Sequence, residues 1–200
     1  MIKAIIFDYG GVMTDSGGGD EISQRLAKFL DLTIDQAHRM MQEPRSDFMK
    51  GKIDEAEFWK LIEKIHGQPV PSEKKKIFNT WEHMHPRPQM LDFVHKLKSH
   101  GYRIGLLSNV LPVTEAIIRE QGAYRLFNPC LLSCKYGYAK PETQMYQELL
   151  KQLPDTKPEE VIFIDDQEKC LVPARAMGIN TVLAKNAGQI INDVSKLLAD

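Results

Sequence analysis

Hydrophobic residues follow two kinds of spacing along this chain of 200 residues. Short apolar runs at residues 2–8, 104–107, 130–132, 161–164 and 181–183 are typical of buried strands. Between these runs, apolar residues recur every three or four positions, which predicts helices. Strands that alternate with helices indicate βαβ units, so the sequence predicts an α/β fold with a doubly wound parallel sheet.

A second pattern fills the stretch from about residue 17 to residue 85, where helical spacing continues without a convincing strand. Four helices are expected here, and their start signals are Asp20, Thr33, Asp54 and Pro71-Ser72. We therefore expect a four-helix cap domain, inserted after the first strand. The predicted boundaries are residues 1–16 and 86–200 for the α/β core domain and residues 17–85 for the helical cap.

Composition limits the classes of partner. Hydrophobic residues make up 42% of the chain, charged residues 26%, and the formal net charge is −1, so neither a nucleic acid nor a membrane is an expected partner. No apolar run approaches the ~20 residues that span a bilayer, and the first residues lack the layout of a signal peptide. The three cysteines are an odd count without ligand-like spacing, which favours reduced thiols and a cytoplasmic location.

Polar residues follow the predicted strands at their carboxyl ends. Asp8 follows the first strand, Ser108 and Asn109 follow the second, and Asp165-Asp166 follow the fourth. Lys140 comes shortly after the third. Because the carboxyl ends of parallel strands share one edge of a sheet, we expect all these side chains to meet there.

The expected group of side chains has a coherent chemistry. Clustered carboxylates repel one another unless a cation lies among them, and oxygen ligands favour Mg²⁺. Lys140 adds a positive charge, and the Ser108 hydroxyl can donate a hydrogen bond to an anion. The set therefore indicates a site for a phosphate group, with one aspartate free to attack it.

These segments resemble the four motifs of the haloacid dehalogenase (HAD) superfamily. The matching segments are Phe7-Asp8-Tyr9-Gly10-Gly11-Val12, Leu107-Ser108-Asn109, Lys140-Pro141 and Phe163-Ile164-Asp165-Asp166, and the spacing Ser133-x3-Gly137-x2-Lys140-Pro141-x4-Tyr146 is a further match. The likeness implies a HAD-like Rossmannoid core. The helical insertion is similar to the C1 cap of subfamily I. The Gly-Gly-Val form of the first motif resembles glucose-1-phosphate phosphatase-like members and the epoxide-hydrolase N-terminal-like branch.

The resemblance also implies a role for each matching residue. Asp8 would be the nucleophile and would form an aspartyl phosphate. Ser108, Asn109 through its backbone, and Lys140 would bind the phosphoryl group. Lys140 would also act in catalysis, because it would neutralise charge on Asp8 and on the phosphate. Asp8, the Gly10 carbonyl, Asp165 and Asp166 would hold Mg²⁺.

One position departs from the pattern. Most phosphatases of this superfamily carry a second aspartate two residues after the nucleophile as a general acid/base, and this chain has Gly10 there. Such help is worth about 10²–10⁴-fold in rate. Asp15 is a candidate for the missing proton donor, and the alternative for Asp15 is a solvated loop carboxylate.

Three functions are compatible with these motifs. The favoured one is a Mg²⁺-dependent phosphatase for a small phosphorylated metabolite, with sugar phosphates among the candidate substrates. A metal-independent 2-haloacid dehalogenase would also dispense with the second aspartate, although paired Asp165 and Asp166 argue for a cation. A binding or regulatory module with little turnover is the third. The sequence identifies neither the substrate nor the oligomeric state.

Overall fold

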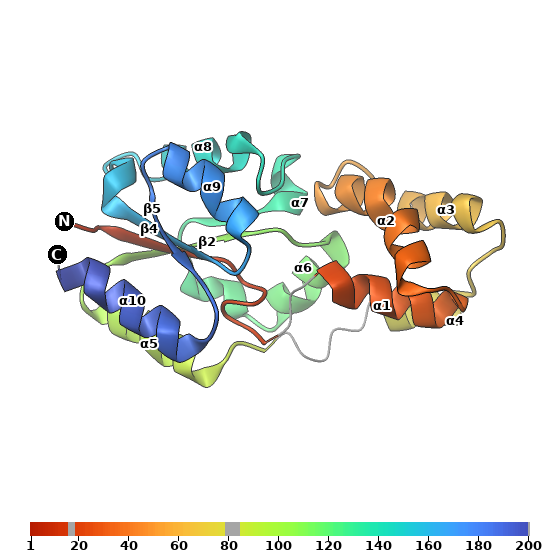
Figure 1. Cartoon of the computed structure of the whole chain (residues 1–200), viewed down its shortest axis with the longest axis horizontal. Helices are drawn as coiled ribbons and strands as arrows, with labels where there is room; N and C mark the ends of the chain where they lie inside the picture. Colours follow the sequence, from red (N-terminus) through yellow and green to blue (C-terminus); the bar gives the residue numbers. More distant parts are fainter. Residues whose placement is uncertain (16–18, 79–84, 200) are drawn as a thin grey trace.

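A computed structural model describes residues 1–15, 19–78 and 85–199 of the chain, and Figure 1 shows the arrangement of its elements. The strands are β1 (Ala4–Phe7), β2 (Arg103–Ser108), β3 (Cys130–Leu132), β4 (Val161–Asp165) and β5 (Asn180–Leu183). The helices are α1 (Gly19–Leu30), α2 (Ile34–Met49), α3 (Glu55–His66), α4 (Ser72–Phe78), α5 (Pro88–Ser99), α6 (Pro112–Glu120), α7 (Ser133–Tyr136), α8 (Thr143–Lys151), α9 (Glu168–Ala176) and α10 (Ala187–Ala199). Two short 3-10 helices, η1 (Ala123–Leu126) and η2 (Pro158–Glu160), complete the set.

The sheet is parallel throughout and has the strand order β3-β2-β1-β4-β5. The first strand therefore lies at its centre, and all four of its residues are fully buried. Gly105 of β2 pairs with Ile6, and a Cβ at Gly105 would lie 2.7 Å from the Ile6 Cδ1 atom. A larger residue there would require the end of the Ile6 side chain to move, and the Pro129 carbonyl oxygen, 3.0 Å away, leaves little room on the other side.

Helices cover both faces of the sheet, as the alternating side chains of a strand require. Ile5 and Phe7 pack on one side against residues of α5 and α10, such as Phe93 and Ile190. Ile6 packs on the opposite side against α8 and α9. In Figure 1 the pair α8 and α9 lies above the sheet and the pair α5 and α10 below it. The predicted α/β class and doubly wound parallel sheet are confirmed.

The four helices α1–α4 follow β1 in the chain and form a group of their own at the far right of Figure 1. Thr33 caps α2 with a capping box that includes Gln36, and Asp54 caps α3. Gly67 ends α3 in the left-handed conformation, with a φ of 80°. These helix boundaries are those that the sequence indicates, because caps are local signals.

Aromatic residues form the centre of this helical group. The rings of Phe48 and Phe58 stack with centroids 4.9 Å apart, and Trp59 meets Phe58 edge-on at 5.2 Å. All three side chains are buried. The sequence also predicts a flexible joint at residues 16–19 and a fourth helix that reaches about Trp81. Both features, and the exact domain boundaries, lie largely outside the described residues.

Three local features differ from the sequence-based expectation. The chain after β3 forms the four-residue helix α7, which is too short to show a helical period. The first strand comprises Ala4–Phe7, shorter than the predicted 2–8. Helix α2 continues through Pro44, although a proline removes one hydrogen bond from a helix interior. Pro44 is buried, so packing outweighs that local cost.

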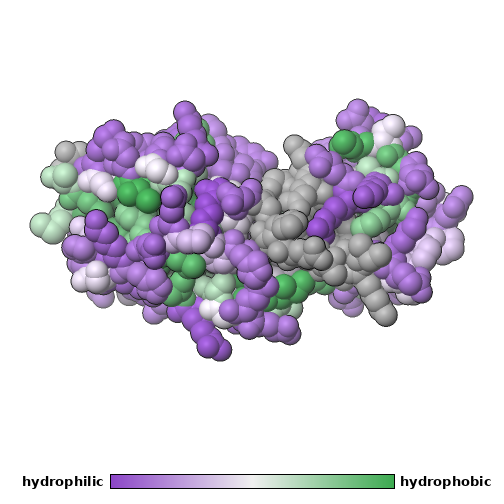
Figure 2. All heavy atoms as spheres, turned by 90° about the horizontal axis from the view of Figure 1, so that it is seen from below, coloured by the Kyte–Doolittle hydropathy of each residue, from purple (hydrophilic) through white to green (hydrophobic). Residues whose placement is uncertain are grey.

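On the face of the molecule in Figure 2, hydrophilic residues predominate and the hydrophobic patches are small and separate. In the described part of the chain, every helix is too short or too polar to serve as a membrane span.

Candidate active site

Asp8 is fixed at the carboxyl end of the central strand. Its backbone N–H donates to the Ile164 carbonyl at 2.9 Å, which continues the ladder between β1 and β4. Its Oδ1 atom accepts a 2.7 Å hydrogen bond from the Tyr9 backbone N–H. Only 7% of the residue is exposed. Backbone contacts on both sides therefore hold the carboxylate in one orientation.

Lys140 reaches this carboxylate from the loop between α7 and α8. Its Nζ atom lies 3.0 Å from Asp8 Oδ2 and 2.6 Å from Asp165 Oδ2. The lysine is 4% exposed, and Asp165 is fully buried. One ammonium group thus bridges two carboxylates that belong to neighbouring strands, β1 and β4. The expected meeting of these side chains at one edge of the sheet is what the geometry shows.

The charges of this group act on one another strongly. Burial, together with the nearby Asp165 charge, raises the pKa of Asp8 to about 6, although Lys140 and a Ser108 hydrogen bond pull it down. Burial by itself would lower the pKa of Lys140, but the charges of Asp8 and Asp165 outweigh it and raise that pKa. The lysine is therefore charged at neutral pH, and Asp8 loses its proton near pH 6.

Asp166 completes a cluster of three carboxylates. Oxygen atoms of Asp8, Asp165 and Asp166 all lie within 4.8 Å of one another. Burial, and then the Asp165 charge, raises the pKa of Asp166. The Asp166 Oδ1 atom is buried and has no hydrogen-bond partner, which is costly for a polar oxygen. An all-oxygen set with one unsatisfied acceptor fits a hard divalent cation such as Mg²⁺.

The turn after β1 is shaped around Asp166. Gly11 has a φ of 71°, and a Cβ there would lie 2.4 Å from Asp166 Oδ2. A side chain at this position would therefore displace the Asp166 carboxylate as well as strain the backbone. The second glycine of the Gly10-Gly11 pair is thus explained by the close approach of the carboxylate.

Ser108 and Asn109 lie at the end of β2, and they act differently. Ser108 is buried, and its side chain hydrogen-bonds Asp8. The Asn109 side chain donates to the Lys140 carbonyl and accepts from the Lys140 N–H, both at 2.8 Å. Asn109 therefore braces the backbone of the lysine. The sequence assigned Asn109 only a backbone role toward phosphate, and that role stays a prediction.

Two further residues connect the site to the helical group, and sequence reasoning gave neither a role. Ser133 Oγ accepts from the Val110 N–H at 3.0 Å and donates to the Met49 carbonyl at 2.7 Å. Glu142, two residues after Lys140, pairs with Lys50 at 2.5 Å. The spacing of Ser133 before Lys140 marked Ser133 as part of the family pattern but did not indicate its contact with α2, and no local pattern signals the contact of Glu142.

Asp15, the candidate proton donor, lies beyond the turn. Its Oδ1 atom accepts a 2.6 Å hydrogen bond from Arg87 Nε, and its side chain is 89% exposed. This setting is that of a solvated carboxylate at the joint between the core and the helical group. The role of the Gly10 carbonyl as a metal ligand stays a prediction.

The chain shares sequence with curated phosphatases over nearly its whole length. It is 24% identical to a glyceraldehyde 3-phosphate phosphatase of Methanothermobacter thermautotrophicus, covering 93% of this chain and 87% of that protein. It is 27% identical to the sesquiterpene phosphatase astK of Aspergillus oryzae, with 88% and 87% covered. A D-ribitol-5-phosphate phosphatase of Bacteroides thetaiotaomicron is 24% identical, with 99% of both chains covered.

Solved structures share the fold. A HAD-like family hydrolase from Porphyromonas gingivalis superposes with a TM-score of 0.82 at 24% identity, covering 100% of this chain and 99% of that one. A HAD family enzyme from Bacteroides thetaiotaomicron, in complex with magnesium and inorganic phosphate, gives a TM-score of 0.73 at 23% identity, covering 94% and 96%. The model of the haloacid dehalogenase-like hydrolases matches residues 2–178. The chain therefore belongs to the haloacid dehalogenase-like hydrolase family, and it is a hydrolase.

Proposed function

We propose that this protein is a Mg²⁺-dependent phosphatase that hydrolyses a small phosphate monoester through an aspartyl-phosphate intermediate. The observation that carries the proposal is the Lys140 ammonium, which lies between Asp8 and Asp165 beside a third carboxylate. The three relatives described above are named as phosphatases, which supports the same reaction class.

In the first step, an Asp8 carboxylate oxygen attacks the phosphorus atom. A bond forms between that oxygen and phosphorus, the ester P–O bond breaks, and the leaving oxygen takes up a proton to become an alcohol. In the second step, water attacks the phosphorus and gives up a proton to solvent, the bond to Asp8 breaks, and inorganic phosphate is released; this proton balances the one that the leaving oxygen took up in the first step. Lys140 offsets the negative charge on the phosphoryl oxygens, and the Ser108 hydroxyl donates to one of them.

Asp8, Asp165 and Asp166 would hold Mg²⁺, with the Gly10 carbonyl as a further ligand. The unsatisfied oxygen of Asp166 supports this assignment. When bound, the ion would offset negative charge on the phosphate and the clustered carboxylates. The Asn109 side chain keeps the backbone of Lys140 in place, so the lysine does not have to be positioned when the substrate arrives.

The leaving oxygen needs a proton, and Gly10 has no side chain that could donate it. Asp15 is held by Arg87 and largely exposed, so we infer that it serves the joint rather than the chemistry. Asp15→Asn should then leave the hydrolysis of an alkyl phosphate unchanged. A drop of about 10²-fold or more with the alkyl phosphate, and none with p-nitrophenyl phosphate, would assign proton donation to Asp15.

The central test is phosphate release from p-nitrophenyl phosphate with Mg²⁺, with and without EDTA. Hydrolysis should require the ion and should disappear in Asp8→Asn, because the nucleophile is lost. Asp155→Asn, an exposed aspartate elsewhere on the core, is the matched control and should be fully active. Halide release from a 2-haloacid without metal would identify a dehalogenase instead. Phosphate binding without any hydrolysis would identify a binding module.

A further inference from the structure

The turn that carries Lys140 is closed by Glu142, two residues further along the chain. The Glu142 backbone N–H donates to the Ala139 carbonyl at 2.7 Å, and Glu142 Oε2 accepts from the Ala139 N–H at 3.1 Å. Ala139 is 3% exposed, so both of its backbone groups need a partner inside the protein. Glu142 supplies a partner for each of them, and Lys140 lies between the two residues that are joined in this way.

Helix α8 does not explain a glutamate at this position. Glu142 is the N-cap of α8, but its side chain makes no cap hydrogen bond to that helix. Serine, threonine, aspartate and asparagine are the residues that cap helices well. The carboxylate instead accepts from Ala139, which precedes Lys140 in the chain. The contact therefore serves the turn around the lysine rather than the helix that Glu142 begins.

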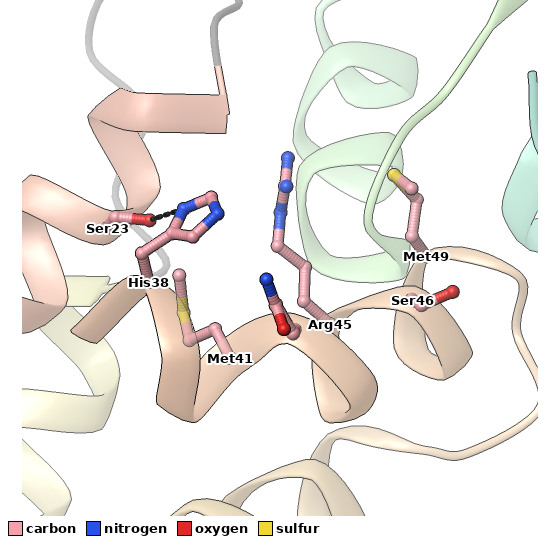
Figure 3. A pocket seen from close by; sticks show the side chains of 7 residues that line it. Ser23, His38, Met41, Arg45, Ser46 and Met49 are labelled. Carbon is pink, nitrogen blue, oxygen red and sulfur yellow. Dashed lines mark hydrogen bonds between the residues drawn. The ribbon is translucent and has the colours of Figure 1, made fainter. Parts of the chain in front are cut away.

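The other oxygen of this carboxylate is paired with Lys50. Glu142 Oε1 accepts from Lys50 Nζ at 2.5 Å. Lys50 directly follows Met49, which Figure 3 labels at the end of α2, and the Met49 carbonyl accepts from Ser133 Oγ at 2.7 Å. Partial burial would raise the pKa of Glu142, but the hydrogen bonds from Lys50 and from the Ala139 N–H outweigh it and lower that pKa. The side chain is therefore an ionised carboxylate, and a different partner fixes each of its oxygens.

The place of the Lys140 ammonium depends on where this turn holds the backbone. A lysine carries its charge on a flexible four-carbon stem, so the charge is located only as well as the backbone and its partners are. Asn109 holds the N–H and the carbonyl of Lys140 itself, and Glu142 holds the residue before it. With both contacts in place, Lys140 Nζ lies 3.0 Å from Asp8 Oδ2 and 2.6 Å from Asp165 Oδ2.

We propose that Glu142 is a positioning residue for the reaction, and that it acts through the Ala139 N–H to keep the Lys140 ammonium in place beside Asp8. The proposal rests on the phosphatase function above. Lys140 offsets charge on the phosphoryl oxygens most effectively if its ammonium group is in place before the reaction begins. A misplacement of about 1 Å can cost about 100-fold in rate. Loss of the contact with Ala139 should therefore impair catalysis more than it impairs folding.

The first test removes this contact with a residue that suits the start of α8. Glu142→Ser loses the acceptor for the Ala139 N–H, but serine is a good N-cap, so the urea midpoint should stay within about 1 M of the native value. The kcat/KM for p-nitrophenyl phosphate with Mg²⁺, per folded protein, should nevertheless fall by about 10–100-fold. A native kcat/KM in Glu142→Ser would overturn the proposal.

Matched variants separate the contact with Ala139 from the charge. Glu142→Gln keeps an oxygen that can accept from the Ala139 N–H, so its kcat/KM should fall by less than about fivefold, the difference between a charged and a neutral acceptor. Lys50→Met removes the ion pair and leaves the carboxylate, and it should resemble Glu142→Gln. Glu148→Ser replaces a half-buried glutamate of α8 that pairs with Lys151, and as the control it should keep the native kcat/KM. An equal loss in Glu142→Ser and Glu142→Gln would assign the effect to the charge and would overturn the proposal.

A spectroscopic measurement distinguishes failure of this proposal from failure of the phosphatase function. The Lys140 side chain is 1% exposed, and the protons of a buried, paired ammonium group exchange slowly with water. Lys140 should therefore give its own ammonium signal in proton–nitrogen NMR spectra, and Lys140→Met identifies that signal.

The signal should shift or broaden in Glu142→Ser and remain in Glu142→Gln. An unchanged signal in Glu142→Ser would overturn the positioning role, even in an active enzyme. A changed signal in a protein that hydrolyses no ester would support the positioning of Lys140 and would overturn the phosphatase function alone.

Discussion

The catalytic edge of the sheet and the helical group are stabilised by different kinds of contact. At the edge, buried charges lie within about 3 Å of one another. Backbone N–H groups hold the carboxylates of Asp8 and Asp165, and the Asn109 side chain holds the backbone of Lys140. The helical group has an aromatic and aliphatic centre. Where α2 meets the core, two polar contacts lie beside apolar side chains that both regions contribute to one buried cluster.

This difference separates two tasks that one protein has to perform. Chemistry at Asp8 needs a fixed arrangement of charges that does not reorganise during reaction. Recognition of the rest of a substrate needs a surface that can accept and release different groups. We infer that the buried edge sets the reaction. The three predictions below compare the charged contacts of the edge with those at the junction to the helical group by their effect on stability, from the largest expected effect to the smallest.

Replacing the bridging lysine should produce the largest loss of stability. Lys140→Met leaves the Asp8 and Asp165 carboxylates buried without a counter-charge, and breaking such a pair costs about 3–5 kcal/mol. Urea unfolding without metal measures the loss, and added Mg²⁺ should restore part of it. The control is Lys196→Met, an exposed lysine, which should cost under about 0.5 kcal/mol. A loss below about 1 kcal/mol in Lys140→Met would mean that other contacts hold the carboxylates.

Removing the Asp8 charge should raise the free energy of unfolding, whereas Lys140→Met lowers it. The folded protein keeps the Asp8 proton up to about pH 6, whereas the unfolded chain loses it near the ordinary value of 3.8. Between these values the folded state binds more protons, so the free energy of unfolding falls as the pH rises. Above pH 6 without metal, the ionised Asp8 should cost about 2–3 kcal/mol.

Asp8→Asn should remove that cost and most of the dependence between pH 4 and pH 6. Urea unfolding in EDTA, at intervals across this range, gives the free energy for both proteins. The exposed Asp155→Asn serves as the control and should keep the native slope. If Asp8→Asn is less stable than the native protein at pH 7 without metal, the carboxylate stabilises the fold rather than opposing it.

The ion pair between α2 and the Lys140 loop should give the smallest effect. Lys50 and Glu142 have side chains that are 15% and 37% exposed, so Lys50→Met should cost up to about 1 kcal/mol, and less in high salt. Lys52→Met tests a nearby lysine whose pair with Asp47 is longer, at 3.9 Å, and about half exposed, and it should change almost nothing. Equal effects of the two substitutions would show that the contact between α2 and the core does not depend on this pair.

Much of the sheet and of the catalytic edge followed from the sequence. The apolar runs before Asp8, Ser108 and Asp165 define buried strands, and the rule that parallel strands share one carboxyl edge then brings these residues together. Lys140 needed a further clue, the spacing from Ser133 through Pro141, because it follows a loop and a short helix. The caps at Thr33 and Asp54 were predictable since they depend only on neighbours in the chain.

The remaining features depend on contacts between distant residues. Nothing near Asn109 indicates that its amide will pair with both backbone groups of Lys140, 31 positions later. Lys50 and Glu142 are 92 positions apart, and the sequence around each predicts only a solvated charge. Pro44 would end an isolated helix, and only its burial in the helical group explains why α2 continues.

The Ser133 hydroxyl has a consequence for how α2 is held against the core. It holds the end of α2 through one hydrogen bond, and the Lys50–Glu142 pair adds a second weak link. Contacts of these kinds contribute about 1 kcal/mol each, so breaking both raises the free energy by about 2 kcal/mol. Buried apolar side chains of the core and of the helical group also belong to one cluster, so separating the two regions would cost more than these two links alone. The polar links therefore set the direction in which α2 approaches the core, while the apolar contacts keep it there.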